Sequence, residues 1–137
     1  MQEQPGEYLV QEIAKAVHRQ VLDLFDYVPD KEQFDLVEDW RSYASEVKRG
    51  ERFSDDCDAF AVTCSELLAE NGAKSSDISL ILCRTEKGGM HLVCGLDTED
   101  TTLILDNRFP QIWAWDDSYN WIKRVTADDP QHWKEIV

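Results

Sequence analysis

Three residues of this chain have the types and the order of a thiol-nucleophile site. Cys57 lies in the run DDCDAFA (residues 55–61), His91 follows 34 residues later, and Asp106 follows His91 after another 15. The thiolate is the nucleophilic form of cysteine, and a nearby imidazole can take up the thiol proton. An aspartate beside that imidazole fixes its tautomer and stabilises its protonated form. The pattern indicates covalent attack by a cysteine on a carbonyl group.

A helix over residues 56–70 should position the cysteine. Its apolar residues recur at spacings of three and four, which is typical of a helix with one buried face. Cys57 belongs to this apolar face and lies in the first turn, and Asn71-Gly72 ends the helix. The unpaired N–H groups at the start of a helix favour negative charge, so they can contribute to an oxyanion hole.

A hairpin of two strands should position the histidine and the aspartate. We expect strands over 78–84, 90–96 and 101–105. If the turn between the last two is centred on Thr98 and Glu99, His91 lies opposite Asp106. Opposed residues point to the same face of a sheet and lie about 5 Å apart at Cβ. The sequence therefore predicts a His91–Asp106 pair on one face of a sheet that is covered on both faces.

The remaining segments complete an α+β fold. We expect helices over 7–27 and from Asp30 to about Arg49, a polar loop over 51–55, and one or two further strands or an aromatic lid after residue 112. The N-terminal helices, one of them carrying the nucleophile at its N-terminus, should pack on an antiparallel β-sheet. A length of 137 residues predicts a single domain over residues 1–137.

The charge of the chain excludes some partners. With 28 acidic and 14 basic residues the net charge is −14, which argues against binding to nucleic acid or to an anionic membrane. The acidic surface serves solubility, or it suits a basic partner or divalent cations. Residues 1–8 lack the basic and apolar regions of a secretory signal. We expect a cytoplasmic monomer, or a periplasmic one if a leader was removed.

The other cysteines predict no metal or disulfide site. Cys64, Cys83 and Cys94 form no Cys-x-x-Cys pair, so a zinc site is not expected. Each lies in an apolar pattern, and we interpret the three as small buried hydrophobic residues.

Three carboxylates crowd the candidate nucleophile. Asp55, Asp56 and Asp58 would raise the pKa of the Cys57 thiol. Two interpretations remain open. The carboxylates cap the helix, or they bind a hard cation such as Ca²⁺, which takes several oxygen ligands.

With these residues in hand, the chain resembles the LapG-like family of bacterial transglutaminase-like cysteine peptidases. The matching stretches are DCDAFA (56–61), MHLV (90–93) and LDNR (105–108). The resemblance implies a papain-like transglutaminase core. It also implies Cys57 as nucleophile, His91 as general base and Asp106 as the residue that orients His91. Asp56 and Asp58 stand where the family has candidate calcium ligands, whereas Ala59 replaces a second acid.

Three functions compete at this stage. The first is an amide hydrolase that cleaves a protein or peptide through an acyl-enzyme, with a glutamine side chain as the alternative substrate and no required cofactor. The second is a catalytically weak or inactive acidic binding module on the same fold, and the third is a regulatory calcium binder. Each residue also has a structural interpretation: Cys57 as a small residue at a helix start, His91 as a buried polar group and Asp106-Asn107 as a turn.

Overall fold

The computed structural model describes residues 6–28 and 41–136. The helices come first: α1 (Gly6–Leu24), α2 (Ala44–Lys48) and α3 (Cys57–Glu70). A 3-10 turn, η1 (Ser75–Asp77), then leads into the main sheet. Among the described residues, none of the helices is both long and apolar enough to cross a membrane.

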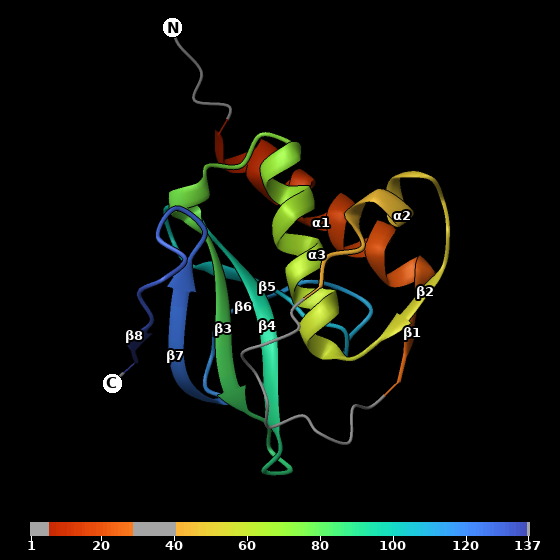
Figure 1. Cartoon of the computed structure of the whole chain (residues 1–137). Coiled ribbons are helices and arrows are strands. Elements are labelled where there is room, and N and C mark those ends of the chain that lie inside the picture. The colour runs from red at the N-terminus through yellow and green to blue at the C-terminus, as the bar shows by residue number, and fades with distance from the viewer. Residues whose placement is uncertain (1–5, 29–40, 137) are drawn as a thin grey trace, which may run out of the picture.

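The main sheet has six antiparallel strands in the order β6-β5-β4-β3-β7-β8. Their bounds are β3 (Ile78–Arg84), β4 (Met90–Asp97), β5 (Thr102–Leu105), β6 (Trp113–Ala114), β7 (Asn120–Thr126) and β8 (Lys134–Glu135). Figure 1 shows β7, β3 and β4 side by side, with the helices on one side of them. The predicted α+β class, with N-terminal helices on an antiparallel sheet, is confirmed.

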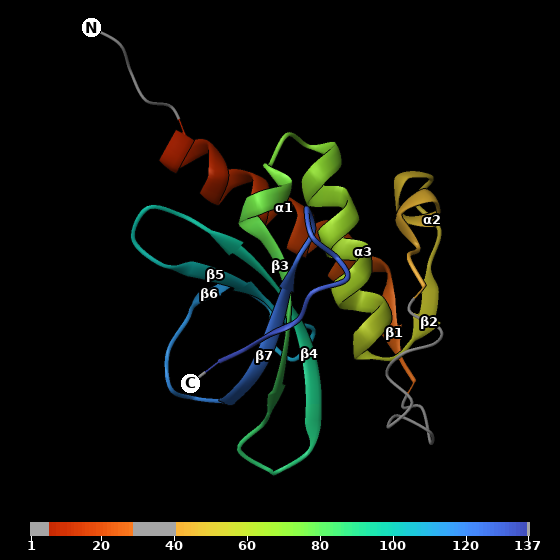
Figure 2. The ribbon, with the colours of Figure 1, turned by 60° about the vertical axis from the view of Figure 1, so that its left-hand side comes forward.

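The two faces of the sheet have different covers. Helices α1 and α3 lie against one face (Figure 2), where a large apolar core includes Phe60, Leu82 and Leu92. The opposite face carries a second cluster, which we call the aromatic cluster: Ile81, Cys83, Val93, Ile104 and Tyr119, packed by Trp113, Trp115 and Trp121. The expectation that both faces are covered is confirmed, although the second cover consists of side chains from the C-terminal strands.

The first helix is shorter than predicted. It ends at Leu24, and Phe25–Tyr27 forms strand β1. This strand pairs in parallel with β2 (Phe53–Asp55), in a segment that we expected to be a polar loop. The Phe25 and Phe53 rings pack 5.3 Å apart between centroids, so burial of two aromatic side chains outweighs the local helical pattern. The pairing matters for the site because it sets Tyr27 opposite Asp55.

The second predicted helix, residues 30–49, lies largely at positions 29–40, outside the described residues. Within its described part, residues 41–43 are not helical and α2 covers Ala44–Lys48. Gly50 follows with φ +77°, the left-handed conformation that commonly ends a helix.

The elements nearest the candidate site agree best with the sequence. Helix α3 begins at Cys57, is capped by Asp56 and ends before Asn71. Strand β3 has its predicted bounds, and β4 and β5 each differ from theirs by one residue. The C-terminal part contributes three short or medium strands, β6, β7 and β8, where one or two strands or a lid were expected.

The β4–β5 hairpin has a different register from the predicted one. Gly95 pairs with Ile104, not with Thr102, so β5 is displaced by two residues. The cause is a turn at Thr98–Thr101, where the Thr98 hydroxyl accepts the backbone N–H groups of Asp100 and Thr101. A displacement of two residues keeps each side chain on its predicted face. His91 and Asp106 therefore become diagonal neighbours, still within reach of each other.

Candidate active site

The first turn of α3 fixes the position of Cys57. The Asp56 carboxylate accepts hydrogen bonds from the backbone N–H groups of Asp58 at 3.1 Å and Ala59 at 3.4 Å. Both N–H groups would otherwise lack a partner within the helix. The helix-capping interpretation is confirmed for Asp56, and it makes Cys57 the first residue of α3.

Cys57 and His91 line the same small cavity. Its volume is about 40 Å³, and the other lining residues are Tyr27, Asp56, Asp58, Leu82 and Met90. A volume of this size can hold a water molecule. The structure therefore brings the predicted nucleophile and the predicted base to one cavity, although they lie 34 positions apart in the sequence.

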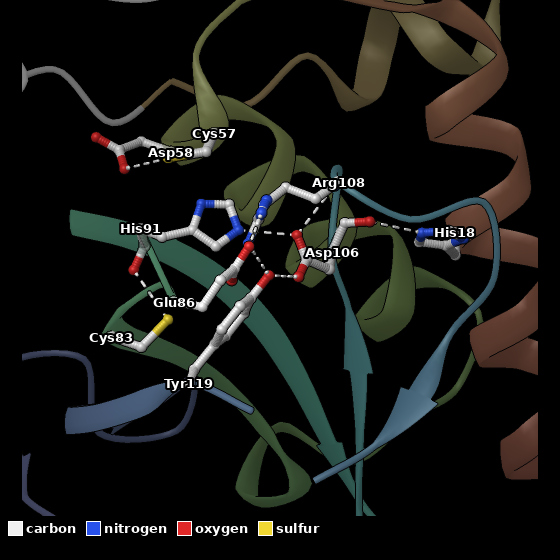
Figure 3. A network of polar contacts seen from close by, with 9 residues as sticks. All are labelled: His18, Cys57, Asp58, Cys83, Glu86, His91, Asp106, Arg108 and Tyr119. Carbon is white, nitrogen blue, oxygen red and sulfur yellow. Dashed lines mark hydrogen bonds and ion pairs between the residues drawn. The ribbon is translucent and has the colours of Figure 1, made fainter. Parts of the chain in front are cut away.

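His91 and Asp106 form a buried pair. The His91 Nε2 atom lies 2.8 Å from Asp106 Oδ1, and the side chains are 6% and 0% exposed. The same carboxylate accepts the backbone N–H of Arg108 on Oδ1 at 3.0 Å and the hydroxyl of Tyr119 on Oδ2 at 2.6 Å. Figure 3 shows these groups converging on Asp106. The predicted His91–Asp106 contact is thus present, and Asp106 is held by more groups than the sequence indicated.

The ionisation of Asp106 determines the form of the imidazole. Burial acts to raise the pKa of Asp106, but hydrogen bonds from His91, Tyr119 and Arg108 together hold it below its usual value. An ionised carboxylate can only accept hydrogen bonds, so His91 Nε2 carries the hydrogen between them. In the neutral ring the lone pair is then on Nδ1, which points toward the Cys57 side of the ring in Figure 3. This is the tautomer that a general base for Cys57 requires.

The Cys57 thiol is held by its neighbour in the described conformation. Its Sγ atom donates to Asp58 Oδ1 at 3.7 Å. Burial, followed by the negative charge of Asp58, raises the pKa of the thiol well above its ordinary value. The carboxylates thus oppose thiolate formation, as the sequence predicted. Activation of this thiol requires that its proton pass to a base other than Asp58.

The sequence did not indicate two of the residues that hold Asp106. His18, on α1 and 1% exposed, donates from Nε2 to the Asp106 backbone carbonyl at 2.9 Å. Tyr119 lies just before β7 and reaches the Asp106 carboxylate from the aromatic cluster. A histidine within the apolar periodicity of the first helix was the one available signal for His18.

The buried position of His18 predicts a pH-dependent stability. Burial lowers the pKa of His18 below 6.5, although the Asp106 carbonyl and carboxylate and the Phe109 carbonyl act to raise it. The unfolded chain then binds a proton near pH 6.5 that the folded chain does not. The stability from the neutral ring is complete above pH 6.5 and is lost as the pH falls toward the lower folded pKa. We expect urea unfolding at pH 5 and pH 8 to differ less in His18→Gln than in the wild type. An unchanged difference would contradict this account.

The remaining cysteines are structural, as predicted. Cys64, Cys83 and Cys94 are each 0% exposed, and all four cysteines are free thiols. Burial raises the pKa of the Cys83 thiol to about 12. Cys57 is therefore the one partly exposed cysteine of the chain. The tryptophans at 113, 115 and 121 are partly buried and pack against the aromatic cluster.

The acidic residues around Cys57 do not form a metal site in their described arrangement. Within residues 6–28 and 41–136, no group of three or more His, Cys, Asp or Glu side chains is placed to hold a metal ion. Asp56 is engaged in capping, and Asp58 faces the thiol. Calcium takes six to eight oxygen ligands, so the Asp56 and Asp58 carboxylates alone do not complete a calcium site.

Comparisons with known proteins indicate the family and the fold of the chain. The model of a family described as bacterial transglutaminase-like cysteine proteinase matches residues 3–137. No curated protein matches the chain. Among solved structures, calcium-bound LapG of Legionella pneumophila is 20% identical with a TM-score of 0.70, and the match covers 86% of this chain and 66% of LapG. EGTA-treated LapG is 18% identical with a TM-score of 0.71, covering 93% and 68%. The chain thus spans about two thirds of the length of LapG and is similar to it in fold.

Proposed function

The chain belongs to the bacterial transglutaminase-like cysteine proteinases, and on that premise we propose that it hydrolyses peptide bonds in a protein substrate through a Cys57–His91–Asp106 triad. The observation that carries this proposal is the buried His91–Asp106 pair next to a cavity that Cys57 also lines. Because Nε2 of His91 is bonded to Asp106, the lone pair on Nδ1 lies on the side of Cys57. Cys57 is the one cysteine that is partly exposed.

The reaction proceeds in two halves. Cys57 exchanges its contact with Asp58 for one with His91, and its proton passes to Nδ1 as Sγ bonds to the carbonyl carbon of the substrate. The backbone N–H of Cys57, at the positive end of α3, stabilises the resulting oxyanion. The imidazolium then gives its proton to the leaving amine, and an acyl-enzyme remains. Water, deprotonated by His91, attacks the thioester, the C–S bond breaks, the acyl group leaves as a carboxylic acid, and the imidazolium returns a proton to the sulfur.

Asp106 supports both halves of the reaction. It stabilises the imidazolium that forms when the thiol loses its proton. Its low pKa keeps it ionised at neutral pH. The hydrogen bond at 2.8 Å also keeps the ring from turning Nδ1 away from the cavity.

One observation favours the second function, an acidic binding module with a residual triad. The Cys57 thiol donates a hydrogen bond to Asp58. Burial and the Asp58 carboxylate raise the pKa of this thiol. A site in which this arrangement persisted would not form the thiolate.

Alkylation of the native protein distinguishes the two functions. In an active site, iodoacetamide should modify Cys57 rapidly near pH 7, while the three buried cysteines react only after unfolding. His91→Ala should slow the modification of Cys57 to the rate of an ordinary buried thiol. Peptide mapping by mass spectrometry identifies the modified residue. Labelling of all four cysteines only in urea would support the binding module.

We further propose that the chemistry requires no cofactor, since each step above uses a side chain or backbone group of the chain. Asp56 and Asp58 remain the candidate calcium ligands, and binding would require both to leave their present partners. We expect the melting temperature and the rate of Cys57 alkylation to be equal in millimolar calcium and in EGTA. A calcium-dependent rise in melting temperature that Asp58→Asn removes would establish the calcium site instead.

We also propose that the chain acts as a cytoplasmic monomer without association with nucleic acid or membranes. The net charge of −14 supports this proposal by disfavouring phosphate-rich surfaces. Size-exclusion chromatography with light scattering should give one mass near 15.9 kDa. Fractionation of the source cells should place the protein in the cytoplasm, and its recovery in the periplasm would overturn the proposed location.

A further inference from the structure

The side of Asp106 that faces away from His91 is closed by a tyrosine. The Tyr119 hydroxyl lies 2.6 Å from Asp106 Oδ2, and its ring meets the His91 ring edge to face at 5.6 Å between centroids. Tyr119 is 5% exposed. We propose that Tyr119 is a positioning residue for the triad, which holds the Asp106 carboxylate and the His91 ring in the base-competent arrangement, and that the Arg108 side chain acts through Tyr119. The kinetic part of this inference rests on the proposed function.

The donors and acceptors around Tyr119 allow one direction of hydrogen bonding. Arg108 Nη1 lies 2.9 Å from the Tyr119 oxygen, and a guanidinium can only donate. The ionised Asp106 carboxylate can only accept. The single hydroxyl hydrogen of Tyr119 must therefore point to Asp106 Oδ2, while the tyrosine oxygen accepts from Arg108. Burial and the contact with Asp106 raise the pKa of Tyr119, which keeps this hydrogen in place.

The Arg108 guanidinium is itself held in position. Glu86, in the turn between β3 and β4, accepts from Arg108 Nη1 at 3.1 Å and from Nη2 at 2.7 Å. The guanidinium carbon also lies 5.6 Å from the centre of the Tyr119 ring. Figure 3 shows the resulting chain of contacts, which runs from Glu86 through Arg108 and Tyr119 to Asp106 and His91.

This series of contacts restricts two rotations on which the base depends, that of the Asp106 carboxylate and that of the His91 ring. With Oδ2 bound to Tyr119, the carboxylate cannot rotate, so Oδ1 remains opposite His91 Nε2. The edge-to-face contact restricts rotation of the imidazole ring. Aromatic packing alone would not require a hydroxyl here, since Tyr119 already packs against Trp113 and Trp121 at 5.4 Å and 5.5 Å. The direct hydroxyl–carboxylate contact is what makes Tyr119 more than a core residue.

Tyr119→Phe tests the inference directly. It keeps the ring and removes only the hydroxyl. We expect kcat for peptide cleavage to fall about 10- to 100-fold, with KM changed by less than about twofold, because misplacement of a reacting group affects the chemical step. In ¹⁵N-histidine NMR spectra, His91 should change from a single Nε2–H tautomer to a mixture of both. Wild-type kcat together with a single tautomer would overturn the inference.

Thr102→Val is the matched control. It removes a hydroxyl that donates to the Asp97 carboxylate at 2.8 Å, at the far end of the same hairpin. We expect a similar loss of stability, but wild-type kcat and an unchanged His91 signal. If Thr102→Val reproduced the effects of Tyr119→Phe, the effects would reflect general destabilisation and the inference would fail.

Arg108→Met tests whether Arg108 acts through Tyr119. It also covers the case in which Tyr119→Phe does not fold. The backbone N–H of Arg108 still donates to Asp106 in this variant, whereas the side-chain contacts with Tyr119, Glu86 and the Phe109 ring are lost. We expect a several-fold lower kcat and partial loss of the single His91 tautomer. In the Tyr119→Phe background the same change should have no further effect. Multiplicative effects of the two changes would show that Arg108 acts independently of Tyr119.

The tautomer readout separates this inference from the proposed function, because it needs no substrate. If Cys57→Ala retained full cleavage, the proposed function would fail while the His91 tautomer change in Tyr119→Phe would still stand. If Cys57→Ala abolished cleavage and Tyr119→Phe changed neither kcat nor the tautomer, the inference alone would fail.

Discussion

Replacing Cys57 with alanine is expected to reduce the rate of peptide cleavage by at least about 10³-fold, because the reaction loses its nucleophile and the acyl-enzyme cannot form. The fold should persist, since the Cys57 side chain is only partly buried and the cap on α3 comes from Asp56. Cleavage of a fluorogenic peptide library measures the rate, and urea unfolding of the same preparation measures the stability of the fold.

Cys64→Ala is the matched control for this prediction. It removes a thiol from the same helix, but from a position that is 0% exposed and faces the apolar core. We expect it to cost about 1 kcal/mol of stability through the lost buried sulfur and to leave the cleavage rate unchanged. Equal rates for Cys57→Ala and the wild type would contradict the thiol mechanism.

Replacing Asp106 with asparagine is expected to lower kcat by about 10³- to 10⁴-fold, the size of effect seen when a catalytic histidine is forced into the wrong tautomer. Both oxygens of Asp106 accept hydrogen bonds, from His91 and the Arg108 backbone on one side and from Tyr119 on the other. If the amide NH₂ group turns toward Tyr119, the hydroxyl loses the oxygen to which it donates in the wild type. If it turns toward His91, the ring must carry its hydrogen on Nδ1, and no lone pair remains for the Cys57 proton.

The same change should lower the free energy of unfolding by about 1–3 kcal/mol, because a fully buried donor is left without an acceptor. Asp97→Asn is the control, since Asp97 lies at the other end of β4 and accepts from Thr102 and Arg124. It should reduce stability without reducing kcat. Comparable losses of kcat in the two variants would show that the effect of Asp106→Asn is not specific to the triad.

Local sequence patterns predicted the elements that carry the candidate site. The apolar spacing and the preceding aspartate located α3 to within one residue, because both signals lie within the helix itself. The cover on both faces of the sheet follows from the uninterrupted apolar runs at residues 80–82 and 103–105. The contact between His91 and Asp106 survived a wrong register because an even displacement leaves both side chains on one face.

Contacts between distant segments could not be predicted in the same way. Tyr119 reaches Asp106 because β7 pairs with β3, which lies more than thirty positions earlier in the chain. His18 reaches the Asp106 carbonyl because α1 packs on the helix-covered face of the sheet. The parallel β1–β2 pair was missed because three residues are too few to give a strand pattern. Each of these features depends on packing between elements, and they are the features that surround Asp106 and Cys57.

Trapping of the covalent intermediate shows whether the Cys57 sulfur is the nucleophile. The protein is mixed with an activated ester of a blocked amino acid, quenched in acid within the first turnover, digested with pepsin and mapped by mass spectrometry. We expect one acyl group per chain, attached to the sulfur of Cys57, and no acyl group in Cys57→Ala. Ester turnover in the wild type with no acyl group on Cys57, or an equal yield of adduct in Cys57→Ala, would contradict this expectation.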